Sequence, residues 1–280
     1  MHAHRFESIS VPRGPATASK PGSGTPTAFH ATNGPPGHWS FGLSDDPMAS
    51  CRPGTLDARY AIRLARTTDH RDAARRLMCE RYQWRGYATD AAQDDSAGIT
   101  LVASELGRIA ATVTVGADSP KGLAVESLYA DEVAKLRREG ARLCEFTRLA
   151  VDRAGDSLKL LGALFHVAYL CARRQHDATH LLVEVNPRHV RFYMRMLGFR
   201  IAGPQRTCER VDAPAVMLAL SLDHAEEQIA QCGGRPELAQ TKRSLYPFFF
   251  AAGSEDGIIA RLVGADRASG RWGHPEAICA

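Results

Sequence analysis

The sequence predicts an α/β domain with a mixed β-sheet flanked by helices. Two apolar runs on either side of the short segment 105–108 are typical of a β-hairpin. Further along, an apolar strand that ends at Asn186 is followed at once by an amphipathic helix with Pro187 at its first position. Because strand and helix patterns of this kind alternate over residues 57–223, we expect one folded domain there.

The composition limits the class of protein. Of the 280 residues, 44% are hydrophobic, which is enough for the core of one domain of roughly 200 residues. The net charge of +4 includes no long basic run, so a nucleic-acid partner is not expected. No apolar run reaches the roughly 18 residues that span a bilayer, and the N-terminus lacks the apolar core of a secretory signal.

The cysteines point to a reducing environment. There are seven, an odd number, and they are widely spaced without a C-x-x-C pair. Reduced thiols in a cytoplasmic protein are the simplest explanation, so a cytoplasmic location is predicted. No spacing typical of zinc ligands is present, and no metal site is predicted.

The chain divides into three parts by composition. Residues 1–56 are rich in Gly, Pro, Ser, Thr and Ala without an apolar period, and we expect a disordered segment. Residues 57–223 carry the regular patterns of the folded domain. Weaker helical signals follow, so residues 224–280 are predicted to form a partly helical C-terminal extension packed on the domain.

Periodicity and end signals place each element of the domain. A short strand precedes a capped helix, the hairpin follows, and helices and strands then alternate. The predicted helices are 68–84, 129–138, 158–175 and 187–197, and the predicted strands are 60–65, 99–104, 109–115, 143–151, 181–186, 200–202 and 215–222. Gly198 is expected to end the last of these helices.

The predicted strand 143–151 carries both a carboxylate and a guanidinium. Simple alternation puts Glu145 and Leu149 on one face and Arg148 on the other, unless a bulge intervenes. Acyl transfer from a thioester to an amine needs a base for the ammonium proton, which Glu145 can supply. From periodicity alone, an ordinary ion pair of Glu145 with an arginine explains the pattern equally well.

Several segments resemble acyltransferases of the GNAT superfamily. Asn186, Tyr193 and the Gly-Phe pair 198–199 follow the buried strand in the order seen in the later half of that fold. The string E-F-T-R-L-A-V-D at 145–152 is similar to a strand of the acyl-homoserine lactone synthases. Four helix residues also match that family's Arg, apolar, Arg, Trp order, namely Arg75, Met78, Arg81 and Trp84.

A closer resemblance is to the long-chain N-acyl amino acid synthases, including the N-acyltyrosine synthases. Four motifs carry it, at residues 80–87, 143–152, 184–193 and 213–216. It implies a GNAT-like fold and transfer of a fatty acyl group from the phosphopantetheine of acyl carrier protein to the α-amine of a small amino acid. No permanently bound cofactor is implied, and acyl-CoA is the other conceivable donor.

Three alternative functions stay open. The acidic pair that lactone synthases use has only Asp90, Asp94 and Asp95 as counterparts, which argues against a lactone product. A CoA-dependent N-acetyltransferase is the second alternative. The third is a non-catalytic module that binds acyl groups or carrier protein.

The donor site departs from the usual pattern of CoA enzymes. The segment R-A-G-D-S-L-K-L-L-G at 153–162 can bind phosphate through the amides of a helix N-terminus. Asp156 disfavours a pyrophosphate, whereas one phosphodiester near Lys159 is compatible, which favours carrier protein over CoA. The residues assigned to donor binding are Leu149, Val151, Lys159 and Leu160, with strand amides near the first two holding the oxyanion.

The remaining site residues follow from the resemblance. Glu145 is assigned as the base and Arg148 as a positioning group. The residues assigned to substrate binding are Arg75, Met78, Arg81, Trp84, Tyr87, Asn186 and Tyr193. Tyr193 lies one residue too far from the Gly-Phe pair for the usual acid, so core packing is preferred for it.

Overall fold

The computed structural model describes residues 60–84, 86–87, 98–152 and 157–268, with side chains of the last segment described over 158–262. The predicted disordered segment 1–56 lies outside these residues. In chain order the main elements are β1 (Tyr60–Leu64), α1 (Thr68–Gln83), β2 (Ile99–Glu105), β3 (Arg108–Ala117), α2 (Glu126–Arg138), β4 (Leu143–Val151), α3 (Ser157–Leu170), η2 (Cys171–Gln175), β5 (His180–Val185), α4 (Pro187–Leu197), β6 (Arg200–Ile201), β7 (Arg206–Cys208), β8 (Ala213–Ser221), α5 (Leu222–Cys232), α6 (Ala239–Lys242) and α7 (Glu255–Ala268).

The junction between β5 and α4 forms as its sequence predicts. The Asn186 side chain accepts a hydrogen bond from the backbone N–H of Arg188 at 3.2 Å, which caps the helix that Pro187 begins. Gly198 ends the helix with φ +79°, and its N–H donates to the carbonyl of Met194. This cap geometry fixes where the α4 side chains point relative to β5.

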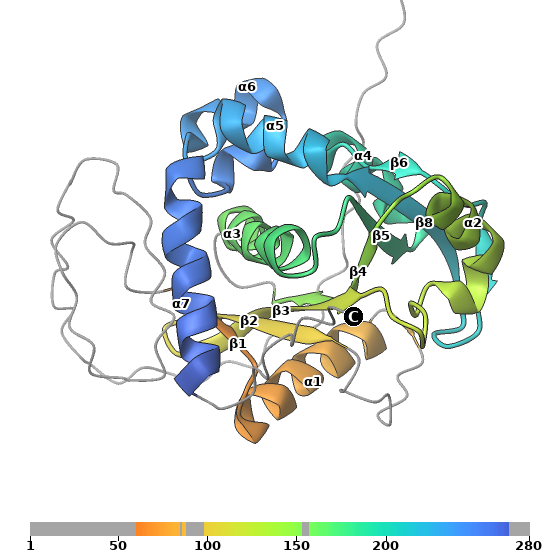
Figure 1. Ribbon diagram of the computed structural model, residues 1–280. Helices are drawn as coiled ribbons and strands as arrows, with labels where there is room; N and C mark the ends of the chain where they lie inside the picture. Colours follow the sequence, from red (N-terminus) through yellow and green to blue (C-terminus); the bar gives the residue numbers. More distant parts are fainter. Residues whose placement is uncertain (1–59, 85, 88–97, 153–156, 269–280) are drawn as a thin grey trace, which may run out of the picture. The chain divides into compact units, whose positions relative to one another are not determined.

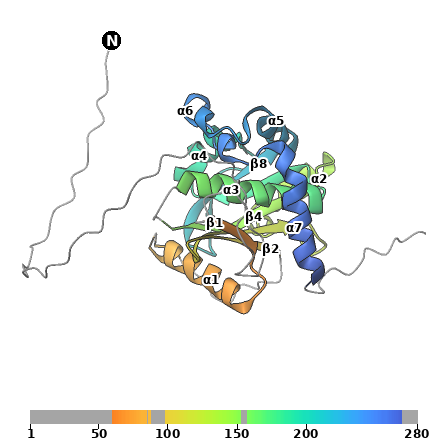
Figure 2. The ribbon, with the colours of Figure 1, turned by 90° about the vertical axis from the view of Figure 1, so that its left-hand side faces the viewer.

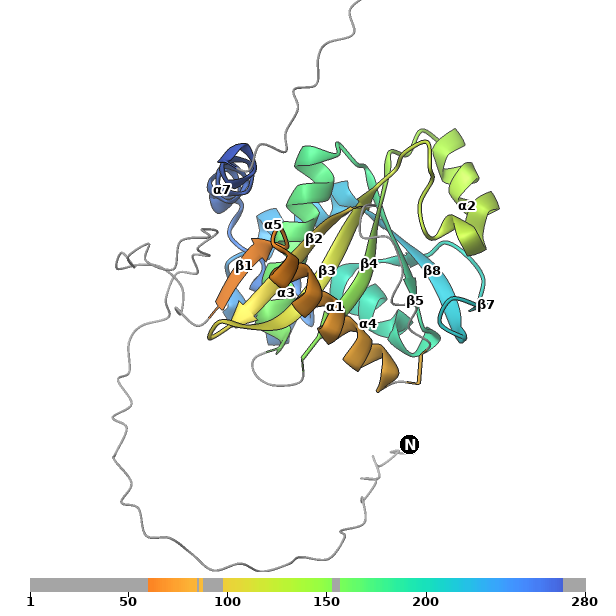
Figure 3. The same cartoon turned by 90° about the horizontal axis from the view of Figure 1, so that it is seen from below.

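The strands form one mixed sheet in the order β1-β2-β3-β4-β5-β8-β6, with β7 paired to β8. Neighbouring strands are antiparallel except for β4 and β5, which are parallel. The parallel ladder covers only four residues of each strand, Leu143–Phe146 and His180–Val183. Beyond it the two strands separate, and in Figure 3 the two halves of the sheet fan apart.

Helices cover both faces of the sheet. Figures 1 and 2 show α1 on one face and α3 on the other, with α4 and α5 on the side of α3. The larger core lies on the α3 side and includes Val183 of β5. Leu182 faces the opposite way, into a smaller core beneath α2 that also holds Tyr129. The middle of β5 is therefore buried on both faces, which accounts for its apolar run at residues 181–183.

A β-bulge in β4 interrupts the simple alternation of side chains that the sequence predicts. The register with β3 shifts between Thr112 and Thr114, which pair with Ala150 and Thr147, so β4 contains one extra residue. Arg148 occupies the bulge with φ +53°. The prediction that Leu149 shares a face with Glu145 was therefore wrong, because Leu149 packs against the larger core on the α3 side.

Helices of the predicted C-terminal extension pack against α3. His166 of α3 is fully buried, and its Nε2 lies 3.1 Å from Glu255 at the start of α7. The backbone N–H of Phe250 donates to Nδ1 of the same ring at 2.9 Å, so the ring carries its proton on Nε2. Burial lowers the pKa of His166, which keeps the ring neutral. No helix in the described part of the chain is long and apolar enough to cross a membrane.

Candidate active site

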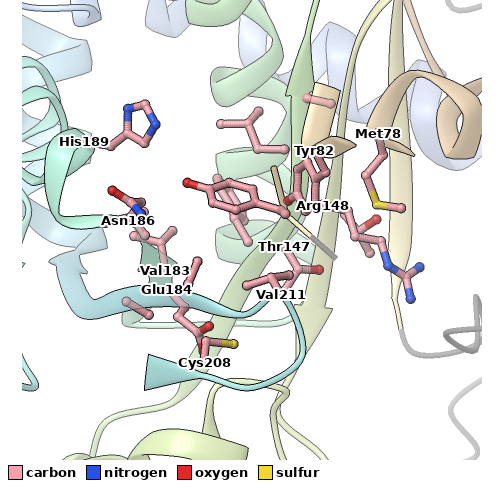
Figure 4. Close-up of a pocket in the computed structure, with 18 of the residues that line it drawn as sticks. Met78, Tyr82, Thr147, Arg148, Val183, Glu184, Asn186, His189, Cys208 and Val211 are labelled. Carbon is pink, nitrogen blue, oxygen red and sulfur yellow. The ribbon is translucent and has the colours of Figure 1, made fainter. Parts of the chain in front are cut away.

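A cavity of about 520 Å³ opens where β4 and β5 separate. Its walls come from α1, α3, α4, the two diverging strands and the turn between β7 and β8. Figure 4 shows Met78, Tyr82 and Arg148 on one side of this space and Glu184, Asn186 and His189 on the other. The splayed strands therefore bring together residues from most of the length of the domain.

Glu145 lines this cavity and is 7% exposed. One carboxylate oxygen accepts the backbone N–H of Ala124 at 2.8 Å, and the other accepts that of Val125 at 3.0 Å. Burial raises the pKa of the Glu145 carboxyl above its usual range, although the two hydrogen bonds favour the ionised form. The hydrogen bonds fix the carboxylate in place, and its raised pKa suits it to accept a proton.

A second carboxylate faces the same space. Glu184 of β5 pairs with Arg210, from the turn between β7 and β8, at an N–O distance of 3.0 Å. Cys208 lies beside them, and burial together with a hydrogen bond to Glu184 raises the pKa of its thiol. The sequence prediction did not assign a role to either member of the ion pair.

Tyr82 is a further polar residue of this cavity. It lines the cavity from α1, and desolvation raises the pKa of its hydroxyl to about 12. The charges of Arg148, Arg210 and Glu184 all act on this hydroxyl. Charges of both signs and a neutral hydroxyl therefore line the same cavity.

The predicted substrate residues on α1 divide into two groups. Met78, Arg81 and Trp84 line the cavity, and Trp84 is 57% exposed, so it lies at the opening. The Arg81 guanidinium is held by an ion pair with Asp152. Arg75 is not among the described residues that line the cavity, and it pairs with Asp72 at 3.0 Å.

Tyr87 also lines the cavity and joins α1 to α4. The Arg188 guanidinium donates to the Tyr87 hydroxyl and lies 5.4 Å from the centre of its ring. The ring packs edge-on against Tyr82 at 5.9 Å between centroids. This contact connects the end of α1 to the first turn of α4 across the opening between them.

Asn186 and Tyr193 both face the cavity from the α4 side. Asn186, which the sequence resemblance assigned to substrate binding, lines the cavity and also caps α4 as described above. Tyr193 is 8% exposed and packs against the rings of Phe165 and Phe199. Burial raises the pKa of its hydroxyl, which fits the preference for core packing.

The donor residues predicted from the sequence are only partly at the cavity. Leu149 and Val151 line it. Lys159 and Leu160 are not among the described lining residues, and Leu160 packs in the larger core, while its neighbour Leu161 faces the cavity. The segment 153–156 and the acidic candidates Asp90, Asp94 and Asp95 lie outside the described residues.

The residues that line the cavity suit group transfer to an amine. Within the described residues, no group of three or more His, Cys, Asp or Glu side chains is arranged to hold a metal ion. Apolar side chains from three helices line the same cavity as two carboxylates, Glu145 and Glu184, and three guanidiniums, those of Arg81, Arg148 and Arg210. Such a site can hold an apolar chain beside a charged nucleophile and take a proton from it.

Comparisons with known proteins agree with this geometry. The sequence matches the family model of the N-acyl amino acid synthase FeeM over residues 73–221. The solved structure of FeeM, from uncultured soil microbes, shares 29% identity with a TM-score of 0.55, covering 59% of this chain and 93% of FeeM. No curated protein sequence matches this chain.

Two more distant structures were also found. The acyl-homoserine lactone synthase LasI shares 13% identity with a TM-score of 0.41, covering 59% of this chain and 91% of LasI. An acyl-CoA N-acyltransferase from Pseudomonas aeruginosa shares 17% identity with a TM-score of 0.42, covering 58% of this chain and 98% of that enzyme.

The protein is an N-acyltransferase with a mixed α/β fold in which helices flank the sheet. It belongs to the FeeM family of N-acyl amino acid synthases, because the family model covers more than half of the chain. The family and the fold class predicted from the sequence motifs are thereby confirmed.

Proposed function

We propose that this protein transfers a long-chain fatty acyl group from the phosphopantetheine thioester of acyl carrier protein to the α-amine of a small amino acid. The observation that carries the proposal is the cavity between β4 and β5, which apolar side chains line together with charges of both signs. The FeeM structure, which matches with 29% identity, is described as an N-acyl amino acid synthase.

The proposed reaction gives Glu145 the role of base. Its carboxylate takes a proton from the acceptor ammonium, directly or through a water. The free amine attacks the thioester carbonyl and the C–N bond forms. The C–S bond then breaks, the nitrogen gives up its second proton, and the leaving thiolate takes up that proton. Backbone amides near Leu149 and Val151 hold the developing oxyanion, and Arg148 positions the reacting groups.

The structure supports these roles through placement. Beyond the four-residue parallel ladder, β4 no longer pairs with β5, so backbone groups of the strand that carries Leu149 and Val151 face the cavity. Arg148 is held at the bulge and lines the same cavity. Glu145 lines this cavity from the fixed position set by its two backbone hydrogen bonds.

The donor preference rests on the surface of α4 as well as on the sequence. Arg188, Arg191 and Arg195 are exposed along this helix, and Arg188 contacts Tyr87 of the cavity lining. Acyl carrier proteins are acidic, so a basic helix at the opening is a suitable docking surface. The acyl chain would lie among apolar side chains such as Met78 and Phe165.

We also propose a cytoplasmic location. The described cysteines are all free thiols, namely Cys79, Cys144, Cys171, Cys208 and Cys232. Free buried thiols are typical of proteins in a reducing compartment. Acyl carrier protein, the proposed donor, is found in the same compartment.

Expression of the full chain in a bacterial host tests the reaction. Mass spectrometry of lipid extracts should find fatty acyl groups amide-linked to an amino acid, absent from cells with the empty vector. The mass of the product also identifies the acceptor and the acyl length. Lipid extracts without such amides, from cells that contain folded protein, would contradict the proposal.

The purified protein then tests the donor. With acyl carrier protein thioesters, free thiol should appear only when the amino acid is present. Turnover with acyl-CoA but not with the carrier protein thioester would overturn the donor assignment. Thioester binding without thiol release would instead favour a non-catalytic binding module.

A further inference from the structure

The ion pair of Glu184 and Arg210 occupies the cavity without a role in the proposed acyl transfer. Glu184 comes from β5, and Arg210 comes from the turn between β7 and β8. Their side chains are 15% and 36% exposed, so both are reachable from the cavity that they line. The pair is therefore placed where a ligand can contact both charges.

Stability alone explains this pair poorly. Partly exposed ion pairs contribute about 0–1 kcal/mol. Placing charges in a partly enclosed space also costs desolvation, which a single 3.0 Å contact offsets only in part. A strand that is otherwise apolar, with Leu182 and Val183 buried on opposite faces, gains little fold stability from a carboxylate at the next position.

The main-chain group of a free amino acid is the electrostatic complement of this pair. It carries a carboxylate and an ammonium on neighbouring atoms. A guanidinium has five N–H donors in a planar fork, and the contacts of Arg210 with Glu184 and Cys208 leave donors for a carboxylate. Glu184 accepts from Arg210 through Oε2 and is also hydrogen-bonded to Cys208, and because a carboxylate has about four acceptor positions, some remain for an ammonium.

The pair also lies near Glu145. In the parallel ladder Glu145 is in register with Leu182, and Glu184 is two residues further along β5, so both carboxylates lie on the same face of the sheet and line the same cavity. A zwitterion bound at the pair would therefore have its ammonium between two carboxylates of the same cavity. That position presents the amine to the proposed base.

We propose that Arg210 and Glu184 form the recognition site for the acceptor, with Arg210 binding its α-carboxylate and Glu184 its α-ammonium. This inference rests on the proposed acyl transfer and adds the feature that the acceptor must carry. The enzyme requires a free α-carboxylate and discriminates against amino acid amides, esters and simple amines of the same side chain.

Steady-state kinetics with matched acceptors test the assignment. The purified full chain is given a saturating carrier protein thioester and either L-tyrosine or L-tyrosinamide, or the amino acid found in the lipid extract and its carboxamide. The intact protein should favour the free acid by about 10- to 100-fold in kcat/KM, which is the range for hydrogen bonds to charged groups. Arg210→Gln should abolish this preference and raise KM for the acid, without changing KM for the thioester.

Further variants separate recognition from folding. Arg210→Lys keeps the positive charge but lacks the planar set of N–H donors, so part of the preference for the free acid over the carboxamide should return. If Arg210→Gln does not fold, Arg210→Lys serves as the test of carboxylate recognition. Glu184→Gln should raise KM for both acceptors equally, because each has the ammonium. Arg200→Gln removes an exposed arginine outside the described cavity lining and should behave like the intact protein.

Two results would have different meanings. A folded Arg210→Gln or Arg210→Lys variant that discriminates between acid and carboxamide as well as the intact protein overturns the recognition site. An intact protein that forms no N-acyl amino acid overturns the proposed function instead.

Discussion

Replacing Glu145 by glutamine separates the catalytic role of this residue from its structural one. The carboxylate accepts two backbone N–H groups, one on each oxygen, from Ala124 and Val125. Glutamine offers one acceptor oxygen and places an NH₂ group against the other N–H. Losing one charge-assisted hydrogen bond costs about 1.5–3 kcal/mol, and a neutral side chain avoids the desolvation that raises the pKa of Glu145. The expected loss of stability is therefore at most about 3 kcal/mol.

The expected loss of activity is larger. Removal of a general base lowers the rate by about 10²- to 10⁴-fold, which corresponds to about 2.7–5.4 kcal/mol in the barrier. A domain with a typical stability of about 5–15 kcal/mol remains mostly folded after the change. Unfolding therefore does not account for a turnover decrease of this size.

The loss of stability and the loss of activity of Glu145→Gln are measured separately. Urea unfolding gives the free energy of unfolding, and release of free thiol from the acyl thioester gives kcat. The matched control is Glu126→Gln, because Glu126 accepts the backbone N–H of Leu123 at 2.6 Å in the same turn but is not among the described cavity residues. The control should lose stability and keep its turnover.

The pH profile gives an independent test of the base. Because burial raises the pKa of Glu145 above its ordinary value of 4.5, kcat/KM should fall as the pH drops through a value above 4.5. Glu145→Gln should lack this acidic limb. A folded Glu145→Gln protein that keeps more than about a tenth of the turnover would refute the reasoning and leave Glu145 as a cap for the loop before α2.

The remaining predictions concern stability. His166→Leu should lower the free energy of unfolding by about 3 kcal/mol in urea, because it removes the partner of the Phe250 N–H and a partner of Glu255; a loss below about 1 kcal/mol would contradict this. Burial holds the pKa of His166 below 6.5, so the unfolded chain takes up the proton first as the pH falls. Thermal melts should therefore show the intact protein losing stability below pH 6.5 relative to His166→Leu, and equal pH slopes would argue against a buried neutral ring. Gly203→Ala should lose about 1–3 kcal/mol in urea, because its Cβ would lie 2.6 Å from the Tyr129 ring, and an unchanged unfolding midpoint would exclude that clash.

Local signals in the sequence were sufficient for most of the fold. The strand 143–151 has the predicted bounds. Both ends of α4 are also where the sequence predicts them, because Pro187 begins the helix and Gly198 ends it. These elements depend on caps, turn residues and apolar periodicity within one segment, which a single sequence displays. The short strand β7, with only three residues, has no such period and was missed.

The candidate site was predicted less completely because its geometry is not local. The bulge at Arg148 depends on pairing with β3, and it moves Leu149 to the other face. Leu160 and Leu161 are neighbours on one helix, and only the packed structure shows which of them faces the cavity. Arg210 lies in a turn without a motif of its own, and only its approach to β5 in the folded chain reveals its pairing.

The separation of β4 and β5 beyond their short ladder leaves two unpaired strand edges in the interior of a single sheet. Edges are usually confined to the margin of a sheet, where exposed N–H and C=O groups invite pairing with foreign strands. Here side chains of α1, α3 and α4 line the cavity into which the two edges open, so these groups lie away from the margin of the sheet. Because the ladder ends after four residues on each strand, backbone groups in the middle of the sheet face the cavity instead of a neighbouring strand.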